Sequence, residues 1–199
     1  VAAGNSAGKA VWEAPDEDWH WVMGVNFYGV LYGVQTFIPH MLEHGEESYI
    51  VNTASLAAVM PMGGSYGVSK HGVLALTEGV QSDLEQRAAN INAGVLCPGF
   101  VDTQIFNAER NRPGAEQTQA DTEDPQYQAA KSMLANGKSP AEIADYVFTA
   151  MANKQFYMLP HPAWDEFVGS RTTQILARQG VATMDLMAML ERSAQGDQF

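Results

Sequence analysis

The chain has 199 residues, 46% of them hydrophobic, so it can bury one substantial core and its length does not require a second domain. Its formal net charge of −12 argues against a nucleic-acid or anionic-membrane partner, because such surfaces select for clustered Lys and Arg. The single cysteine, Cys97, excludes an intrachain disulfide framework, and no apolar run reaches the roughly 18 residues that span a bilayer. These features are typical of a cytoplasmic protein.

The first long element is a helix from about residue 17 to 43. Pro15 and the acidic residues that follow it favour a helix start, because acidic side chains suit the positive end of the helix dipole. Apolar residues cover more than one side of this helix, so we expect a sheet beneath it and another helix or subunit above it. Asn26 lies in its middle, either as a hydrogen-bonded buried polar residue or at a slight bend.

A strand–helix–strand unit comes next. Tyr49 to Thr53 predicts a strand, and a helix follows from Ser65, whose side chain can cap it, to about Arg87. Ile91 to Leu96 predicts a second strand, and a right-handed crossover makes the two strands parallel.

The rest of the chain is less regular. The pattern predicts a short helix near residues 104–109, a polar stretch to about 124, helices near 125–135 and 139–152, a short strand at 156–159 and a final helix at 162–179.

The pentapeptide YGVSK carries the strongest chemical signal. Tyr66 and Lys70 are four residues apart near a helix start, so they share one face, where an ammonium can lower a phenol's pKa. Ser55 lies just past one predicted strand and Pro98-Gly99 just past the next, and ligands of open α/β sheets bind beyond the carboxyl ends of the strands. A second match, YQAAK, lacks this setting, and we interpret its Tyr127 and Lys131 as a surface helix pair.

Other candidate residues have ordinary interpretations. His40 and His44 are spaced i, i+4 and could bind zinc, but no third ligand is evident, so we expect no metal site. Cys97, at the end of a buried strand, is expected to be a packing residue.

Four segments, in this order, resemble the short-chain dehydrogenase/reductase family of the classical type: WHWVMGVNFYGV, YIVNTASLAA, SYGVSKHGVLALT and CPGFVDT. The resemblance runs from about Glu13 to Thr103 and implies an α/β fold with a doubly wound, Rossmann-like parallel sheet. The later segment YMLPHPAW is similar to a subgroup in which a Pro-His-Pro turn follows a short strand.

This resemblance implies roles for particular residues. Tyr66 would be the catalytic acid/base, Lys70 would bind the nicotinamide ribose and lower the phenol's pKa, Ser55 would hydrogen-bond the substrate carbonyl, and Asn26 would hold a water in a proton relay with Lys70. The cofactor, NAD or NADP, would be contacted by Tyr66, Lys70, Pro98, Gly99, Val101 and Thr103.

A Gly-rich turn that binds the cofactor's pyrophosphate is absent before residue 13. We therefore expect the chain to lack the N-terminal β-α-β cofactor half and to form a single partial Rossmann-like domain over residues 1–199. Residues 1–103 would be its catalytic core, and 104–199 its substrate-side loop, C-terminal helices and last strand.

The leading hypothesis is an NAD(P)-dependent oxidoreductase that interconverts a small-molecule alcohol and carbonyl compound by Tyr-Lys-assisted hydride transfer. At full length it would form a homo-oligomer through the two long helices. Two alternatives remain open: a non-catalytic truncated fragment or dimerising scaffold, and an epimerase or dehydratase that uses the same Tyr-Lys pair. The choice between NAD and NADP is also open, because the selecting residue follows the second strand of a complete dinucleotide fold.

Overall fold

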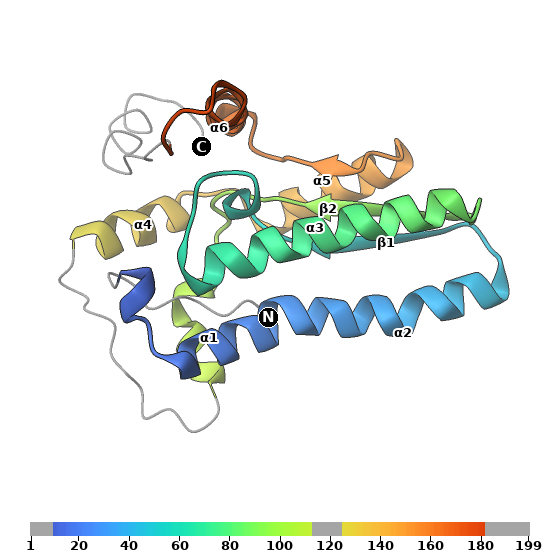
Figure 1. The fold of residues 1–199 in the computed structure, drawn as a ribbon, viewed down its shortest axis with the longest axis horizontal. Helices are drawn as coiled ribbons and strands as arrows, with labels where there is room; N and C mark the ends of the chain where they lie inside the picture. The colour runs from blue at the N-terminus through green and yellow to red at the C-terminus, as the bar shows by residue number, and fades with distance from the viewer. Residues whose placement is uncertain (1–9, 113–124, 182–199) are drawn as a thin grey trace.

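A computed structural model describes residues 10–112 and 125–181 (Figure 1). In this part of the chain three parallel strands form one sheet in the order β1-β2-β3. They are β1 (Ser48–Thr53), β2 (Ile91–Leu96) and β3 (Tyr157–Met158). The parallel register pairs the first residues of β1 and β2 with each other and also the last, so both strands end at the same edge of the sheet. All three strands were predicted correctly, as was the parallel pairing of β1 with β2.

Helices cover both faces of the sheet. On one face, Val95 of β2 packs in a cluster with Val73 of α3 (Gly64–Gln86). On the other face, Leu96 packs with Ile143 of α5 (Pro140–Ala152). Because successive strand residues point to opposite faces, β2 is buried between two helical layers. The predicted doubly wound α/β architecture is confirmed for the described residues.

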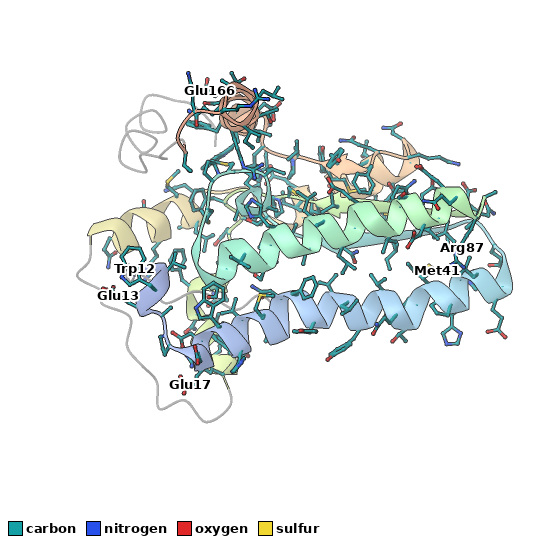
Figure 2. The ribbon with its side chains drawn as sticks, in the orientation of Figure 1. Trp12, Glu13, Glu17, Met41, Arg87 and Glu166 are labelled. Carbon is teal, nitrogen blue, oxygen red and sulfur yellow. The ribbon has the colours of Figure 1, made fainter. Side chains whose placement is uncertain are left out.

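The predicted first helix is present, in three segments: α1 (Asp16–Met23), a π-helical segment (Gly24–Tyr28) and α2 (Gly29–His44). It lies alongside α3, and Met41 of α2 and Arg87 at the end of α3 lie at the same end of the pair (Figure 2). The π-helical segment is centred on Asn26, which is buried and hydrogen-bonded to Ser69, so the prediction of a hydrogen-bonded buried polar residue is confirmed.

The described residues cover this helix on one side only, and a helix or subunit over its second side stays a prediction. Val34 of α2 joins Val80 of α3 and Ile91 of β2 in one apolar cluster, so the helix packs mainly on α3. Its other side is open, with Tyr32 60% exposed and Phe37 57% exposed.

The start of α3 differs from the prediction, which made Ser65 the capping residue. The helix begins at Gly64, with Gly63 instead of Ser65 at the N-cap position and no side-chain cap. Gly64 has a φ of 69°, which glycine adopts without strain, so Gly63 and Gly64 complete the turn and Ser65 is already inside the helix. Ser65 is 2% exposed there, and its hydroxyl has no hydrogen-bond partner within the described residues.

The remaining elements match the predicted ones to within a few residues: 3-10 turns at Ile105–Asn111, α4 (Pro125–Ala135), α5, a 3-10 turn at Pro162–Trp164 and α6 (Asp165–Ala177). Ser139 and Glu142 form the capping box of α5, with backbone-to-side-chain distances of 3.2 and 2.8 Å. Most of the predicted polar stretch, residues 113–124, lies outside the described residues. No helix in the described ranges combines the length and apolar character that a membrane span needs.

Gly67 allows the loop before α3 to fold back onto the first turn of that helix. A Cβ atom at Gly67 would lie 2.1 Å from the carbonyl oxygen of Met62, which no real side chain could accommodate without a shift of backbone. Gly79, on the same helix, has nothing within 4 Å of the corresponding position.

We therefore predict opposite effects for two identical substitutions in α3. Gly67→Ala should lower the free energy of unfolding by about 1–3 kcal/mol, because the new methyl group overlaps the Met62 backbone. Gly79→Ala should raise it by up to about 1 kcal/mol, because alanine is the better helix former. Denaturant unfolding followed by circular dichroism measures both, and equal effects of the two substitutions would contradict the packing described for Gly67.

Candidate active site

The candidate residues converge at the carboxyl edge of β1 and β2. The segment after β1 is tied to the end of β2 by two backbone hydrogen bonds, from Ala54 N to Leu96 O at 2.7 Å and from Leu56 N to Pro98 O at 2.9 Å. Ser55, between the two donors, is therefore held next to the turn that begins at Pro98. Its hydroxyl accepts a hydrogen bond from Ala57 N at 3.2 Å.

Lys70 lies under this edge as a buried cation. Its side chain is on the same helical face as Tyr66, with Nζ 5.7 Å from the centre of the Tyr66 ring. The residue is 4% exposed, and Nζ donates a hydrogen bond to the carbonyl oxygen of Thr53, at the end of β1, at 3.1 Å. Burial lowers the pKa of Lys70 to about 8, because leaving water disfavours the charged form.

Tyr66 has its pKa shifted in the direction opposite to the expectation. Burial raises the pKa of the Tyr66 phenol, and the hydrogen bond between the Tyr66 and Ser55 side chains lowers it by a smaller amount. Lys70 was expected to lower this pKa, but the net shift is upward because desolvation outweighs the effect of Ser55. The phenol is therefore protonated at neutral pH and able to donate a proton.

Asn26 is connected to the backbone of Tyr66 through a serine. Its Nδ2 donates to Ser69 Oγ at 3.1 Å, and Ser69 Oγ donates to Tyr66 O at 2.7 Å. Asn26 is 2% exposed and Ser69 is fully buried, so the hydrogen bond between them is shielded from water. Sequence reasoning missed Ser69, although a serine inside YGVSK, next to the buried lysine, was a usable signal.

The turn after β2 is held by a histidine that sequence reasoning also missed as a site residue. His161 Nδ1 accepts a hydrogen bond from Gly99 N at 3.1 Å, and Nε2 donates to Phe100 O at 3.0 Å. The ring is 1% exposed, and burial is the main cause that lowers its pKa. The Pro-His-Pro segment was noted in the sequence only as a turn.

Two predicted cofactor-contact residues lie further along the same segment. Val101 is partly buried and forms an isolated parallel bridge with Lys138. Thr103 is exposed, and no described hydrogen bond joins it to Tyr66 or Lys70. The structure thus brings Ser55, Tyr66 and Lys70 together.

The remaining candidates are packing or surface residues. Cys97 is 1% exposed and packs with Val95, as predicted, and burial raises the pKa of its thiol to about 11. His40 is on the surface, with its Nδ1 atom 3.8 Å from Oε2 of Glu43. Among the described residues no three His, Cys, Asp or Glu side chains gather as metal ligands would. Lys131 of the second YxxxK match is exposed on α4, and the side chain of Tyr127 lies outside what the structure describes.

The buried Lys70 predicts a pH-dependent stability. The folded pKa of about 8 is below the value of about 10.4 in the unfolded chain, so between these pH values the unfolded chain binds more protons. The free energy of unfolding should therefore be highest, as far as Lys70 is concerned, above about pH 10.4, and it should fall as the pH is lowered toward 8.

Comparison with Lys70→Met isolates this effect. The unfolding free energy of the parent minus that of the variant should rise by about 1–2 kcal/mol between pH 8 and pH 9.5, at about 1.4 kcal/mol per pKa unit. Urea unfolding at both pH values gives this difference, in which the other lysines cancel. A flat difference would contradict a desolvated ammonium at this position.

The chain is similar to known proteins over most of its length. Residues 1–114 match the family model described as short chain dehydrogenase. A CLA biosynthesis dehydrogenase/reductase from Lactiplantibacillus plantarum is 34% identical over 187 residues, which are 86% of this chain and 64% of the relative. A 1-deoxy-11-beta-hydroxypentalenate dehydrogenase from Streptomyces avermitilis is 31% identical over 156 residues, covering 76% of this chain and 50% of the relative.

A solved structure agrees with the fold as well. A short chain dehydrogenase/reductase from Burkholderia phymatum, crystallised in complex with NAD, superposes with a TM-score of 0.82 at 36% identity, covering 93% of this chain and 67% of that one. The chain spans between half and two thirds of the length of the curated relatives named above. The family model matches more than half of the chain, and the arrangement of helices on a parallel sheet is that of a solved family member. The chain therefore belongs to the short-chain dehydrogenase family.

Proposed function

We propose that the protein is an NAD(P)-dependent oxidoreductase that interconverts a small alcohol and the corresponding carbonyl compound. The observation that carries this proposal is Tyr66 lying beside the buried Lys70 ammonium, with Ser55 near enough to lower the phenol's pKa, at the edge where β1 and β2 end. The dehydrogenase and reductase names of its relatives support the reaction class.

Tyr66 and Ser55 have the chemistry that carbonyl reduction requires. A nicotinamide, when bound, supplies or accepts the hydride. Reduction builds negative charge on the substrate oxygen, which the Ser55 hydroxyl can stabilise with a hydrogen bond. Tyr66, protonated because burial raises its pKa, donates the proton that converts this oxygen into an alcohol. In the oxidative direction Tyr66 accepts the proton.

Lys70 and Asn26 would support the proton transfer. With a pKa of about 8, Lys70 is mostly charged at pH 7, so it stabilises the phenolate that remains after Tyr66 has donated. Asn26 is proposed to hold a water molecule that relays protons between Lys70 and solvent. Its described contact with Ser69 also holds the Tyr66 backbone in position.

The residues present fit the nicotinamide end of a dinucleotide. Lys70 is a donor beside Tyr66, and the turn that starts with Pro98 and Gly99 leaves β2 next to Ser55, where ligands of parallel sheets bind. We propose that Tyr66, Lys70 and the segment from Pro98 to Thr103 hold this end of the cofactor. The relative from Burkholderia phymatum, which was crystallised with NAD, supports a cofactor of this class.

We also propose that copies of the complete protein associate through α2 and α3. The support is the exposed aromatic surface on α2, which includes Tyr32 and Phe37. Phe37→Lys should shift the protein to a smaller species in analytical ultracentrifugation, because it places a charge in the contact. A parent that sediments as a monomer would contradict this assembly.

The function is tested with the two YxxxK tyrosines, each changed to phenylalanine in the protein expressed from its complete gene. Tyr66→Phe should lower turnover by about 10²–10⁴-fold, the usual contribution of a general acid, because the ring remains and only the proton donor is lost. Tyr127→Phe is the matched control and should leave turnover unchanged. The assay follows oxidation of NADH and NADPH with a panel of ketones and aldehydes.

Circular dichroism of both variants confirms that each is folded. Turnover that survives Tyr66→Phe unchanged would overturn the assignment of Tyr66. Product analysis that finds an epimer or a dehydrated compound, with no net change in the nicotinamide, would overturn the alcohol/carbonyl reaction.

A further inference from the structure

His161 forms hydrogen bonds to two peptide groups of the same turn. It follows β3 in the sequence Pro160-His161-Pro162, and its ring reaches the turn after β2, accepting from the Gly99 N–H at 3.1 Å and donating to the Phe100 carbonyl at 3.0 Å. A backbone N–H can only donate and a carbonyl can only accept, so both bonds form only when Nδ1 is bare and Nε2 carries the proton. The ring is therefore neutral and held in one tautomer.

The turn that contains Gly99 and Phe100 is tightly packed. A Cβ atom at Gly99 would lie 3.0 Å from Leu56 Cδ1 and 3.3 Å from His161 Cγ, so the Gly99 backbone is enclosed between the Ser55 segment and the histidine ring. The Phe100 carbonyl also accepts a hydrogen bond from Lys138 N at 3.2 Å. Segments before α5 and after β3 thus converge on the peptide groups of this turn.

The histidine itself is rigidly placed. Prolines on both sides restrict the backbone, and the carbonyl of His161 accepts a hydrogen bond from Trp164 N at 3.1 Å. Cys97 N bonds to Met158 O at 2.9 Å, so β3 is attached to the chain just before the turn as well. A fixed ring can therefore transmit a fixed geometry to Gly99 and Phe100.

We propose that His161 is a positioning residue for the nicotinamide: its two hydrogen bonds set the backbone of the turn from Pro98 to Val101 in the conformation that receives the cofactor. The proposal rests on the proposed function, because it assumes that this turn contacts a nicotinamide. His161 acts through the turn and is not itself placed at the reacting atoms. Its loss should weaken dinucleotide binding more than it slows the chemical step.

Three substitutions, made in the protein expressed from its complete gene, separate the two hydrogen bonds. In His161→Asn the Oδ1 atom lies near the former Nδ1 and can still accept from Gly99. In His161→Gln the Nε2 atom lies near the former Nε2 and can still donate to Phe100. His161→Leu removes both bonds while it keeps a buried side chain of similar volume.

The first readout is independent of activity. Amide hydrogen exchange at Gly99, measured by NMR, should be slow in the parent and in His161→Asn. It should be about tenfold faster or more in His161→Gln and His161→Leu, since the bond that protects this amide is gone.

The second readout is the dissociation constant of NADH and NADPH from fluorescence. It should rise about tenfold in His161→Leu, the effect of losing one or two net hydrogen bonds, and less in the Asn variant. The KM for the dinucleotide should follow it, while kcat stays within about twofold.

Tyr66→Phe separates failure of this proposal from failure of the proposed function. It should lose turnover and keep slow exchange at Gly99, and its dissociation constant for the dinucleotide should rise less than that of His161→Leu, because only the phenol oxygen is removed from the cofactor contacts. A His161→Leu protein that binds the dinucleotide as tightly as the parent would overturn the positioning role alone. A parent protein that binds neither NADH nor NADPH would overturn the proposed function and the positioning role with it. If the Leu variant does not fold, unchanged binding in both the Asn and Gln variants would overturn the positioning role in its place.

Discussion

The buried ammonium of Lys70 is the interaction on which the arrangement of the site depends. A charge that is 4% exposed is costly unless it is hydrogen-bonded, and the bond from Nζ to the Thr53 carbonyl provides this partner at the last residue of β1. The bond joins the first turns of α3 to the edge of the sheet and thereby brings Tyr66 next to Ser55. Burying this ammonium lowers the free energy of unfolding, as the lowered pKa of about 8 indicates. In return, a charged group lies beside the Tyr66 phenol.

The surroundings of Tyr66 and Lys70 are built largely from backbone contacts. The Ser69 hydroxyl binds the Tyr66 carbonyl and is in turn bound by Asn26, so the π-helical segment supports the tyrosine from one side. Gly67, the residue after Tyr66, leaves space for the Met62 carbonyl against the first turn of α3. Contacts of Asn26, Ser69 and the Met62 backbone therefore help to determine where the Tyr66 phenol lies. The geometry of catalytic groups commonly depends on such supporting contacts.

Much of the fold could be predicted because its signals are local. β1 and β2 are short apolar runs rich in strand-forming residues, and α5 opens with a Ser-Pro pair and a glutamate that form its capping box. The errors came where a tertiary contact decided the outcome. Ser65 is a good N-cap residue by propensity, but the Gly63-Gly64 turn places the N-cap of α3 at Gly63 and buries the Ser65 hydroxyl. The apolar second side of α2 is exposed, and the described residues do not cover it.

The sequence by itself determined the family resemblance, the parallel α/β architecture and the residues Ser55, Tyr66 and Lys70, because short motifs at the ends of strands report local geometry directly. Only the tertiary structure decided what surrounds them. The pKa of Tyr66 is raised because burial, which no motif encodes, outweighs its favourable contacts. His161 is distant from Gly99 along the chain, and only the pairing of β3 with β2 brings its ring to that turn. Contacts between segments far apart depend on packing, and packing is set by the whole chain.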